Sequence, residues 1–121
     1  MDDEGTVMGS EQVIQILTDR INAKPKSTAD WGGSIIWYFV NTEEAYLMKF
    51  ATDGKVETTE KSSLNLLKQK KPNAIINTST DTMEMLLDGT IQAAAAMGSG
   101  SIKIEGSLES VFKLAPALGP Q

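Results

Sequence analysis

The first pattern along the chain is a stripe of apolar side chains at helical spacing. At 100° per residue, the apolar positions between residues 10 and 22 fall within an arc of roughly 160°, which is typical of a helix with one buried face. These positions are Val13, Ile14, Ile16, Leu17 and Ile21. Ser10 can cap the first turn and Pro25 ends the pattern, so we predict a helix from Ser10 to about residue 23. Residues 1–9 are polar and acidic, and we expect them to form a flexible tail.

The pattern changes to that of β-strands in the second quarter of the chain. Residues 35–40 and 45–51 are rich in β-branched and aromatic side chains, and a polar turn separates them. The pair Asp53-Gly54 is a strong hairpin signal and leads into a third strand at 56–59. Because short turns join neighbouring strands, these runs predict an antiparallel meander.

Short helices and strands alternate in the second half of the chain. The lysine-rich span 61–72 fits either a short helix or a mobile flap. The elements expected after it are a strand at 73–78, helices near 80–88 and 91–97, a strand at 101–105 and a helix at 108–114. This order of elements predicts an α+β fold with a five-stranded, mostly antiparallel sheet.

The composition removes most catalytic chemistry from consideration. The chain has 121 residues, the length of one domain, and we place that domain at residues 10–118. It contains no Cys and no His, so disulfides, imidazole or thiolate metal sites, and Ser-His-Asp or Cys-His nucleophile systems are excluded. The net charge of -5 is the wrong sign for a grip on phosphate backbones, and we expect no nucleic-acid partner.

The remaining signals for chemistry are weak. Gly98 and Gly100 suggest a phosphate-binding loop, but Lys103 stands where the third glycine belongs, and the loop leads into a strand rather than a helix. Several acidic residues sit at turns and helix ends, where capping and solvation account for them. They are Asp53, Asp81, Glu84 and Asp88. We therefore predict no catalytic residue, no metal site and no cofactor.

Arg20 is the only arginine of the chain, and it lies about 50° from the centre of the apolar stripe of the first helix. Two interpretations are open. The side chain can snorkel at the rim of the core, or its guanidinium can stand at a pocket mouth and bind a carboxylate ligand in bidentate fashion.

Four lysines form a local basic patch in this acidic chain. They are Lys61, Lys68, Lys70 and Lys71. The patch is either a solvated face or a surface for transient docking to an anionic membrane or to the phosphates of an acyl-CoA.

A set of residues in the second half of the chain matches a known family pattern. The set comprises Asn73-Ala74-Ile75-Ile76, Met83, Leu86-Leu87, Gly89, Ile91, Ala96-Met97 and Phe112-Lys113-Leu114. The most specific block is a strand of the Gly-x-Leu-Lys-Ile-x-Gly type, which reads Gly100-Ser101-Ile102-Lys103-Ile104-Glu105-Gly106. This pattern resembles the sterol carrier protein type 2 family, and the likeness covers about residues 10–115.

The resemblance implies helices on one face of the five-stranded sheet, enclosing a hydrophobic tunnel for fatty acids, fatty acyl-CoA or sterols. It places near the tunnel Met83, Leu86, Leu87, Ile91, Met97, Ile104, Leu108, Val111 and Phe112, with Trp37, Phe39, Met48, Phe50 and Ile76 on the inner face of the sheet. Insect members similarly use an arginine near the first helix to bind the fatty-acid carboxylate. That similarity of region makes Arg20 a candidate anchor.

The chain also departs from the family pattern. The run from Ala93 to Ala96 offers less bulk than the family's usual side chains, so we expect a wider or looser tunnel. The acidic start is unlike a secretory signal, and the end at Gln121 lacks a Ser-Lys-Leu type address. We expect an intracellular protein, cytoplasmic rather than peroxisomal.

The function predicted from these observations is that of a non-enzymatic carrier that takes up one lipid without converting it. Two alternatives are open. The same fold can be an interaction module whose core is filled by its own side chains, or it can be the carrier domain of a larger lipid-metabolising enzyme.

Overall fold

The computed structural model describes residues 9–118, and the tail predicted for residues 1–9 lies almost wholly outside them. The first helix, α1 (Ser10–Ala23), has the predicted bounds. Its cap differs from the prediction. Gly9 is the N-cap residue, and the side chain of Gln12 accepts a hydrogen bond from the Gly9 N–H at 3.0 Å. The Ser10 hydroxyl is therefore released from capping and points to the sheet.

The sheet has five strands in the order β3-β2-β1-β4-β5. Their bounds are β1 (Ser34–Phe39), β2 (Glu44–Phe50), β3 (Val56–Ser62), β4 (Ala74–Thr78) and β5 (Lys103–Gly106). Three of the neighbouring pairs are antiparallel, and β1 and β4 pair in parallel at the centre. The α+β class and the mostly antiparallel sheet are thus confirmed. Strand β3 runs further than predicted and includes Lys61.

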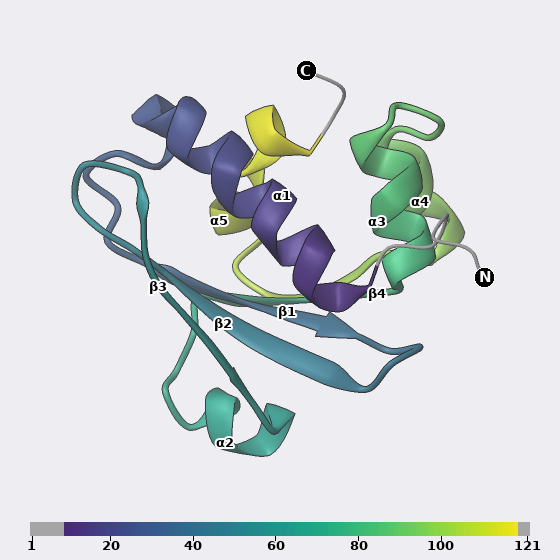
Figure 1. Ribbon diagram of the computed structural model, residues 1–121, viewed down its shortest axis with the longest axis horizontal. Coiled ribbons are helices and arrows are strands. Elements are labelled where there is room, and N and C mark those ends of the chain that lie inside the picture. The colour runs from purple at the N-terminus through teal and green to yellow at the C-terminus, as the bar shows by residue number, and fades with distance from the viewer. Residues whose placement is uncertain (1–8, 119–121) are drawn as a thin grey trace.

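The other helices are short. They are η2 (Pro25–Thr28), α2 (Leu64–Lys68), α3 (Thr80–Leu87), α4 (Ala93–Ser99), α5 (Leu108–Phe112) and η3 (Ala115–Ala117). Figure 1 shows α1, α3, α4 and α5 above the sheet and α2 below it. The expected arrangement, with the helices on one face of the sheet, therefore holds for α1, α3, α4 and α5, whereas α2 lies on the opposite face. None of the helices in residues 9–118 is both long and apolar enough to cross a membrane.

Alternation along β1 divides the interior into two clusters. Ile35, Trp37 and Phe39 point to the large cluster beneath α1 and α3. Ile36 points the other way and packs with Leu67 of α2 in a small cluster. Strand β1 is buried on both faces because α2 covers the side that would otherwise meet water.

Two glycines are required by the way the chain closes on itself. Gly54 has a φ of +91°, and a Cβ there would lie 2.0 Å from the Pro25 carbonyl oxygen. Gly106 has a φ of +93°, and its Cβ would lie 2.7 Å from the Asn73 carbonyl oxygen. The Asp53-Gly54 turn therefore packs against the connector after α1, and Gly106 lets the end of β5 approach the start of β4.

Candidate functional site

An apolar cavity of about 200 Å³ lies between the sheet and the helices of the second half of the chain. Its lining consists of Trp37, Ile76, Met83, Leu86, Ala93, Ala94, Met97, Ile102, Ile104, Val111, Phe112, Ala115 and Leu118. Apart from the indole N–H of Trp37, these side chains offer only carbon and the sulfur of methionine. The cavity is thus suited to the apolar part of a ligand.

Three strands supply the floor of this cavity. Trp37 of β1 is the register partner of Ile76 of β4, and Ile76 is the partner of Ile104 of β5. Cross-strand partners point to the same side of a sheet, so these residues form one row across three strands. The row runs from the central strand β1 through β4 to the edge strand β5.

Helices α3 and α4 supply the wall. Met83 and Leu86 are three positions apart and lie on one face of α3, which starts where the Ser79 hydroxyl accepts a hydrogen bond from the Thr82 N–H at 3.0 Å. Helix α4 contributes Ala93, Ala94 and Met97, of which Ala94 and Met97 are also three positions apart.

The cavity reaches the surface beside α5. Phe112 lines it and yet is 59% exposed, and Leu108 one turn earlier is 43% exposed. Leu108 and Phe112 are four positions apart on one face of α5, so they extend the apolar surface of the cavity outward, and a continuous apolar surface of this kind is typical of ligand-binding grooves. Phe112 therefore stands at the mouth, in contact with both the interior and the solvent.

The structure brings about half of the predicted ligand-binding residues to this cavity. Those in its lining are Trp37, Ile76, Met83, Leu86, Met97, Ile104, Val111 and Phe112. Those outside it are Arg20, Phe39, Met48, Phe50, Leu87, Ile91 and Leu108. Phe39 and Phe50 lie on the predicted inner face, but each packs against an aromatic ring in the solid part of the core, Tyr46 and Trp31 respectively.

Sequence reasoning missed five lining residues. They are Ala93, Ala94, Ile102, Ala115 and Leu118. The three alanines gave no signal as contact residues, because a methyl group adds little to an apolar stripe. The reduced bulk expected along residues 93–96 concerns the width of the tunnel, and it covers Ala93 and Ala94 but not Ala115.

Arg20 is held by the backbone of another helix. Its Nη2 donates a hydrogen bond to the Leu87 carbonyl oxygen at 2.9 Å, at the C-terminal end of α3. A cation at a helix C-terminus also meets the negative end of the helix dipole. Arg20 lines a shallow depression with Lys24, Thr28 and Lys113, apart from the cavity. The carboxylate-anchor role stays a prediction, and the observed contact is a tether between α1 and α3.

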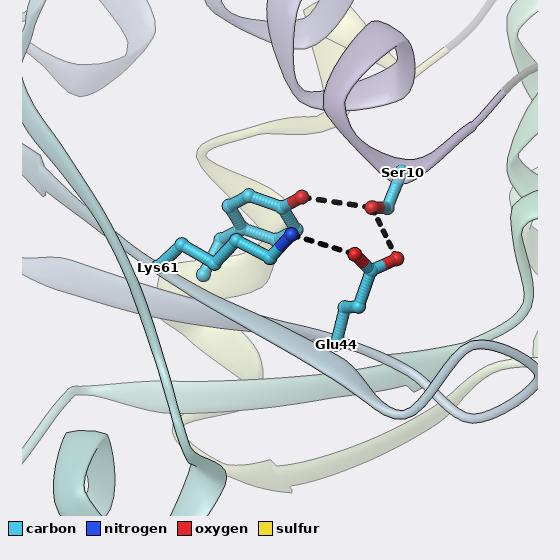
Figure 2. Close-up of polar contacts among 4 residues, drawn as sticks. Ser10, Glu44 and Lys61 are labelled. Atoms are coloured by element: carbon cyan, nitrogen blue, oxygen red, sulfur yellow. Dashed lines mark hydrogen bonds and ion pairs between the residues drawn. The ribbon is translucent and has the colours of Figure 1, made fainter.

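The lysine patch includes two ion pairs. Lys61 Nζ lies 2.7 Å from Glu44 Oε2, and Lys70 Nζ lies 2.8 Å from Glu60 Oε1. Figure 2 shows Glu44 between Lys61 and Ser10, whose hydroxyl donates to Glu44 Oε1 at 2.6 Å. The hydrogen bond from Lys61, aided by those from Ser10 and Thr42, lowers the pKa of Glu44 from 4.5 to about 2. The Glu44 bond in turn raises the pKa of Lys61.

Comparison with known proteins identifies the family. A model of the SCP-2 sterol transfer family matches residues 14–119. The chain belongs to this family. The SCP-2 match spans the sheet, the helices above it from Ile14 of α1 onward, and every lining residue of the cavity. No curated protein is similar enough in sequence to match the chain.

Solved structures show the SCP-2 fold in different settings. The solution structure of palmitated SCP2L2 from Aedes aegypti has a TM-score of 0.66 at 17% identity, covering 92% of this chain and 95% of that one. The sterol carrier protein domain 2 of Helicoverpa armigera has a TM-score of 0.66 at 18% identity, with coverages of 91% and 89%. The sec-alkylsulfatase Pisa1 from Pseudomonas sp. has a TM-score of 0.74 at 14% identity, and the match covers 93% of this chain. This chain spans only 16% of the sulfatase.

Proposed function

We propose that this protein binds a single lipid molecule by its apolar part in the cavity and carries it without chemical conversion. The observation that carries the proposal is the lining itself, which joins apolar side chains from three strands and four helical segments around one space. Membership of a sterol transfer family supports the same function.

The proposed ligands are long-chain fatty acids, fatty acyl-CoA and sterols. One structural neighbour is described as palmitated and another as a sterol carrier domain, which supports these classes. At about 200 Å³ the cavity is smaller than the roughly 300 to 1,000 Å³ of usual ligand pockets. A long ligand therefore either extends past Phe112 into the solvent or widens the cavity as it enters.

The free energy of burying an alkyl chain favours loose specificity for chain length. Each buried methylene contributes about 0.8 kcal/mol, so eight of them give roughly 6 kcal/mol before the cost of ordering the chain. An apolar wall discriminates only weakly between chains that differ by one methylene. We expect affinity to rise with chain length up to the length that the cavity holds and then to level off.

Displacement of a fluorescent fatty acid from the delipidated protein tests the proposal. Palmitate, palmitoyl-CoA and cholesterol serve as competitors, and native mass spectrometry of the purified protein reports any bound lipid. We expect saturable one-to-one binding. A folded protein with no co-purified lipid and no displacement would instead support an interaction module with a closed core.

Helix α4 offers a matched pair of variants for this test. Ala94 and Ala95 are adjacent and exposed, but only Ala94 lines the cavity. We expect Ala94→Phe to weaken fatty-acid binding at least ten-fold, because the ring enters the lipid's space, and Ala95→Phe to leave it within two-fold. Equal effects of the two substitutions would place the lipid elsewhere.

A second proposal is that the domain serves as the lipid-holding part of a larger enzyme. The fold match to a small part of a sulfatase favours it. In that case catalysis belongs to residues outside this domain. The isolated chain would bind the lipid with the same affinity but would need the enzyme to convert it, which assays with and without the candidate enzyme would show.

We further propose that membrane contact through Lys61, Lys68, Lys70 and Lys71 is transient and weak. Two of these lysines already pair with carboxylates, and α2 lies on the face of the sheet opposite the helices that wall the cavity (Figure 1). Co-sedimentation with anionic vesicles tests this contact. Charge reversal at Lys68 and Lys71 should abolish binding to the vesicles while leaving fatty-acid displacement unchanged.

A further inference from the structure

Among the described residues, one buried side-chain polar atom has no hydrogen-bond partner, whereas other buried hydroxyl groups are satisfied. The Thr78 hydroxyl donates to the Ser101 carbonyl oxygen at 3.0 Å, and the Ser10 hydroxyl is shared between Glu44 and Tyr46. Among the buried side-chain nitrogens and oxygens of residues 9–118, only the indole Nε1 of Trp37 has no hydrogen-bond partner. Such an exception calls for a physical explanation, because an unsatisfied buried donor lowers stability.

The surroundings of Trp37 explain why the fold does not satisfy it. The side chain is fully buried and lines the apolar cavity. Its register partners are Ile76, which has no polar group, and Tyr46, whose hydroxyl already pairs with Ser10 at 2.8 Å. The remaining lining residues bring only apolar side chains. Because the Nε1 atom itself has almost no accessible surface, an acceptor that enters the cavity meets this N–H only where the ligand moves a lining side chain aside.

We propose that the indole N–H of Trp37 donates a hydrogen bond to a neutral oxygen of the bound lipid. This inference rests on the proposed function and narrows its ligand class. The ligand would carry a hydroxyl or carbonyl oxygen within the part that enters the cavity, rather than only at an exposed head.

The charge of the cavity argues for a neutral oxygen. No lysine or arginine lines it. A carboxylate buried there would lose its hydration without gaining a counter-charge, which costs far more than one hydrogen bond returns. A carboxylate therefore stays at the mouth beside Phe112, whereas an alcohol, ketone or ester oxygen can go deeper and meet Trp37.

Two short ligands of equal length test this inference on the full chain. Undecane and 2-undecanone differ by one carbonyl oxygen, and both are delivered to 15N-labelled protein. The chain has two tryptophans, so Trp31→Phe assigns the two indole signals and serves as the control variant, since Trp31 does not line the cavity. We expect the ketone to move the Trp37 indole proton downfield and undecane to leave it nearly unmoved.

Trp37→Phe supplies the second measurement, because it removes the donor and keeps an aromatic ring. We expect it to weaken 2-undecanone binding about five-fold, as the loss of one net hydrogen bond implies, and to change undecane binding less than two-fold. Trp31→Phe should leave both affinities within two-fold. If Trp37→Phe does not fold, the indole shifts of the wild-type protein decide the question alone.

The outcomes separate this inference from the proposed function. If both ligands bind but the Trp37 indole responds equally to them, the hydrogen bond is refuted and the lipid cavity stands. If neither ligand binds, and Ala94→Phe leaves fatty-acid displacement unchanged, the cavity itself is refuted as a lipid site and the inference falls with it.

Discussion

The hydroxyl oxygens of Ser10 and Tyr46 lie 2.8 Å apart and join the first residue of α1 to the buried face of β2. Ser10 is only 3% exposed and also donates to Glu44. The polar contact fixes the N-terminal end of α1 over the sheet, while the apolar stripe of the helix packs in the large core cluster. Two testable consequences concern this contact and the neighbouring Glu44, and two concern other contacts of the fold.

Replacement of Ser10 by Ala should lower the free energy of unfolding by about 1 to 2 kcal/mol, because it leaves the buried Tyr46 hydroxyl without its partner. Chemical denaturation measures the loss. Tyr46→Phe and the double variant complete a cycle, and we expect the double variant to lose less than the sum of the single losses. Strict additivity would show that the two hydroxyls do not interact.

Glu44 makes the stability depend on acid pH. Its pKa is about 2 in the folded protein and 4.5 ordinarily, so its ionised form stabilises the fold above pH 4.5 and the contribution is lost as the pH falls toward 2. With 29% of its side chain exposed, solvent screening limits the effect to about 1 kcal/mol.

Chemical denaturation at several pH values between 2.5 and 6 measures this contribution of Glu44 to the free energy of unfolding. Glu44→Gln should flatten the pH dependence, and Glu57→Gln, on the exposed part of β3, should leave it as in the wild type. An unchanged slope in Glu44→Gln would assign the acid sensitivity to other carboxylates.

Arg20→Ala should destabilise the protein by about 1 to 2 kcal/mol, since the Leu87 carbonyl loses a charge-assisted hydrogen bond. Palmitate affinity should change less than two-fold, because Arg20 is not in the cavity lining. Thermal unfolding and fluorescent displacement give the two readouts. A selective loss of palmitate affinity, with hexadecanol binding intact, would instead establish the carboxylate anchor.

Gly106→Ala should destabilise the protein by about 2 to 4 kcal/mol. The φ of +93° is strained for alanine, and the new methyl group would meet backbone atoms of Asn73. Gly98→Ala is the matched control. It lies in α4 with open space around the added methyl group and should be neutral or stabilise by up to about 1 kcal/mol. Equal effects would show that Gly106 is not a required close approach.

The hydrophobic pattern predicted most of the fold because it reports which face of each element is buried. Helix α1, the meander and strands β4 and β5 follow from local spacing and from the Asp53-Gly54 turn. The position of α2 was not predictable in this way. Only Leu67 of that helix is fully buried, and one side chain cannot indicate which face of a sheet it covers.

The site was less predictable than the fold, since a cavity is defined by the space that the surrounding side chains leave unfilled. Periodicity placed Phe39 and Phe50 on the correct inner face, but their rings fill space rather than enclose it. Ala93 and Ala94 line the cavity through their small size, which no periodic pattern reveals. The missing partner of Trp37 depends on every neighbour in three dimensions and leaves no trace in the sequence.

The parallel pairing of β1 with β4 has a consequence for how the protein folds. Strands β1, β2 and β3 are joined by short turns and can pair early. Strand β4 pairs with β1 only after the chain has passed through β2, β3 and α2, so this pairing closes a long loop. The entropy of closing that long loop is lost before its contacts form, which slows folding of sheets of this kind. The floor and walls of the cavity come largely from residues 76–118, so the cavity forms only after this slow step. A nascent chain that has released only its first half thus has no place to hold a lipid.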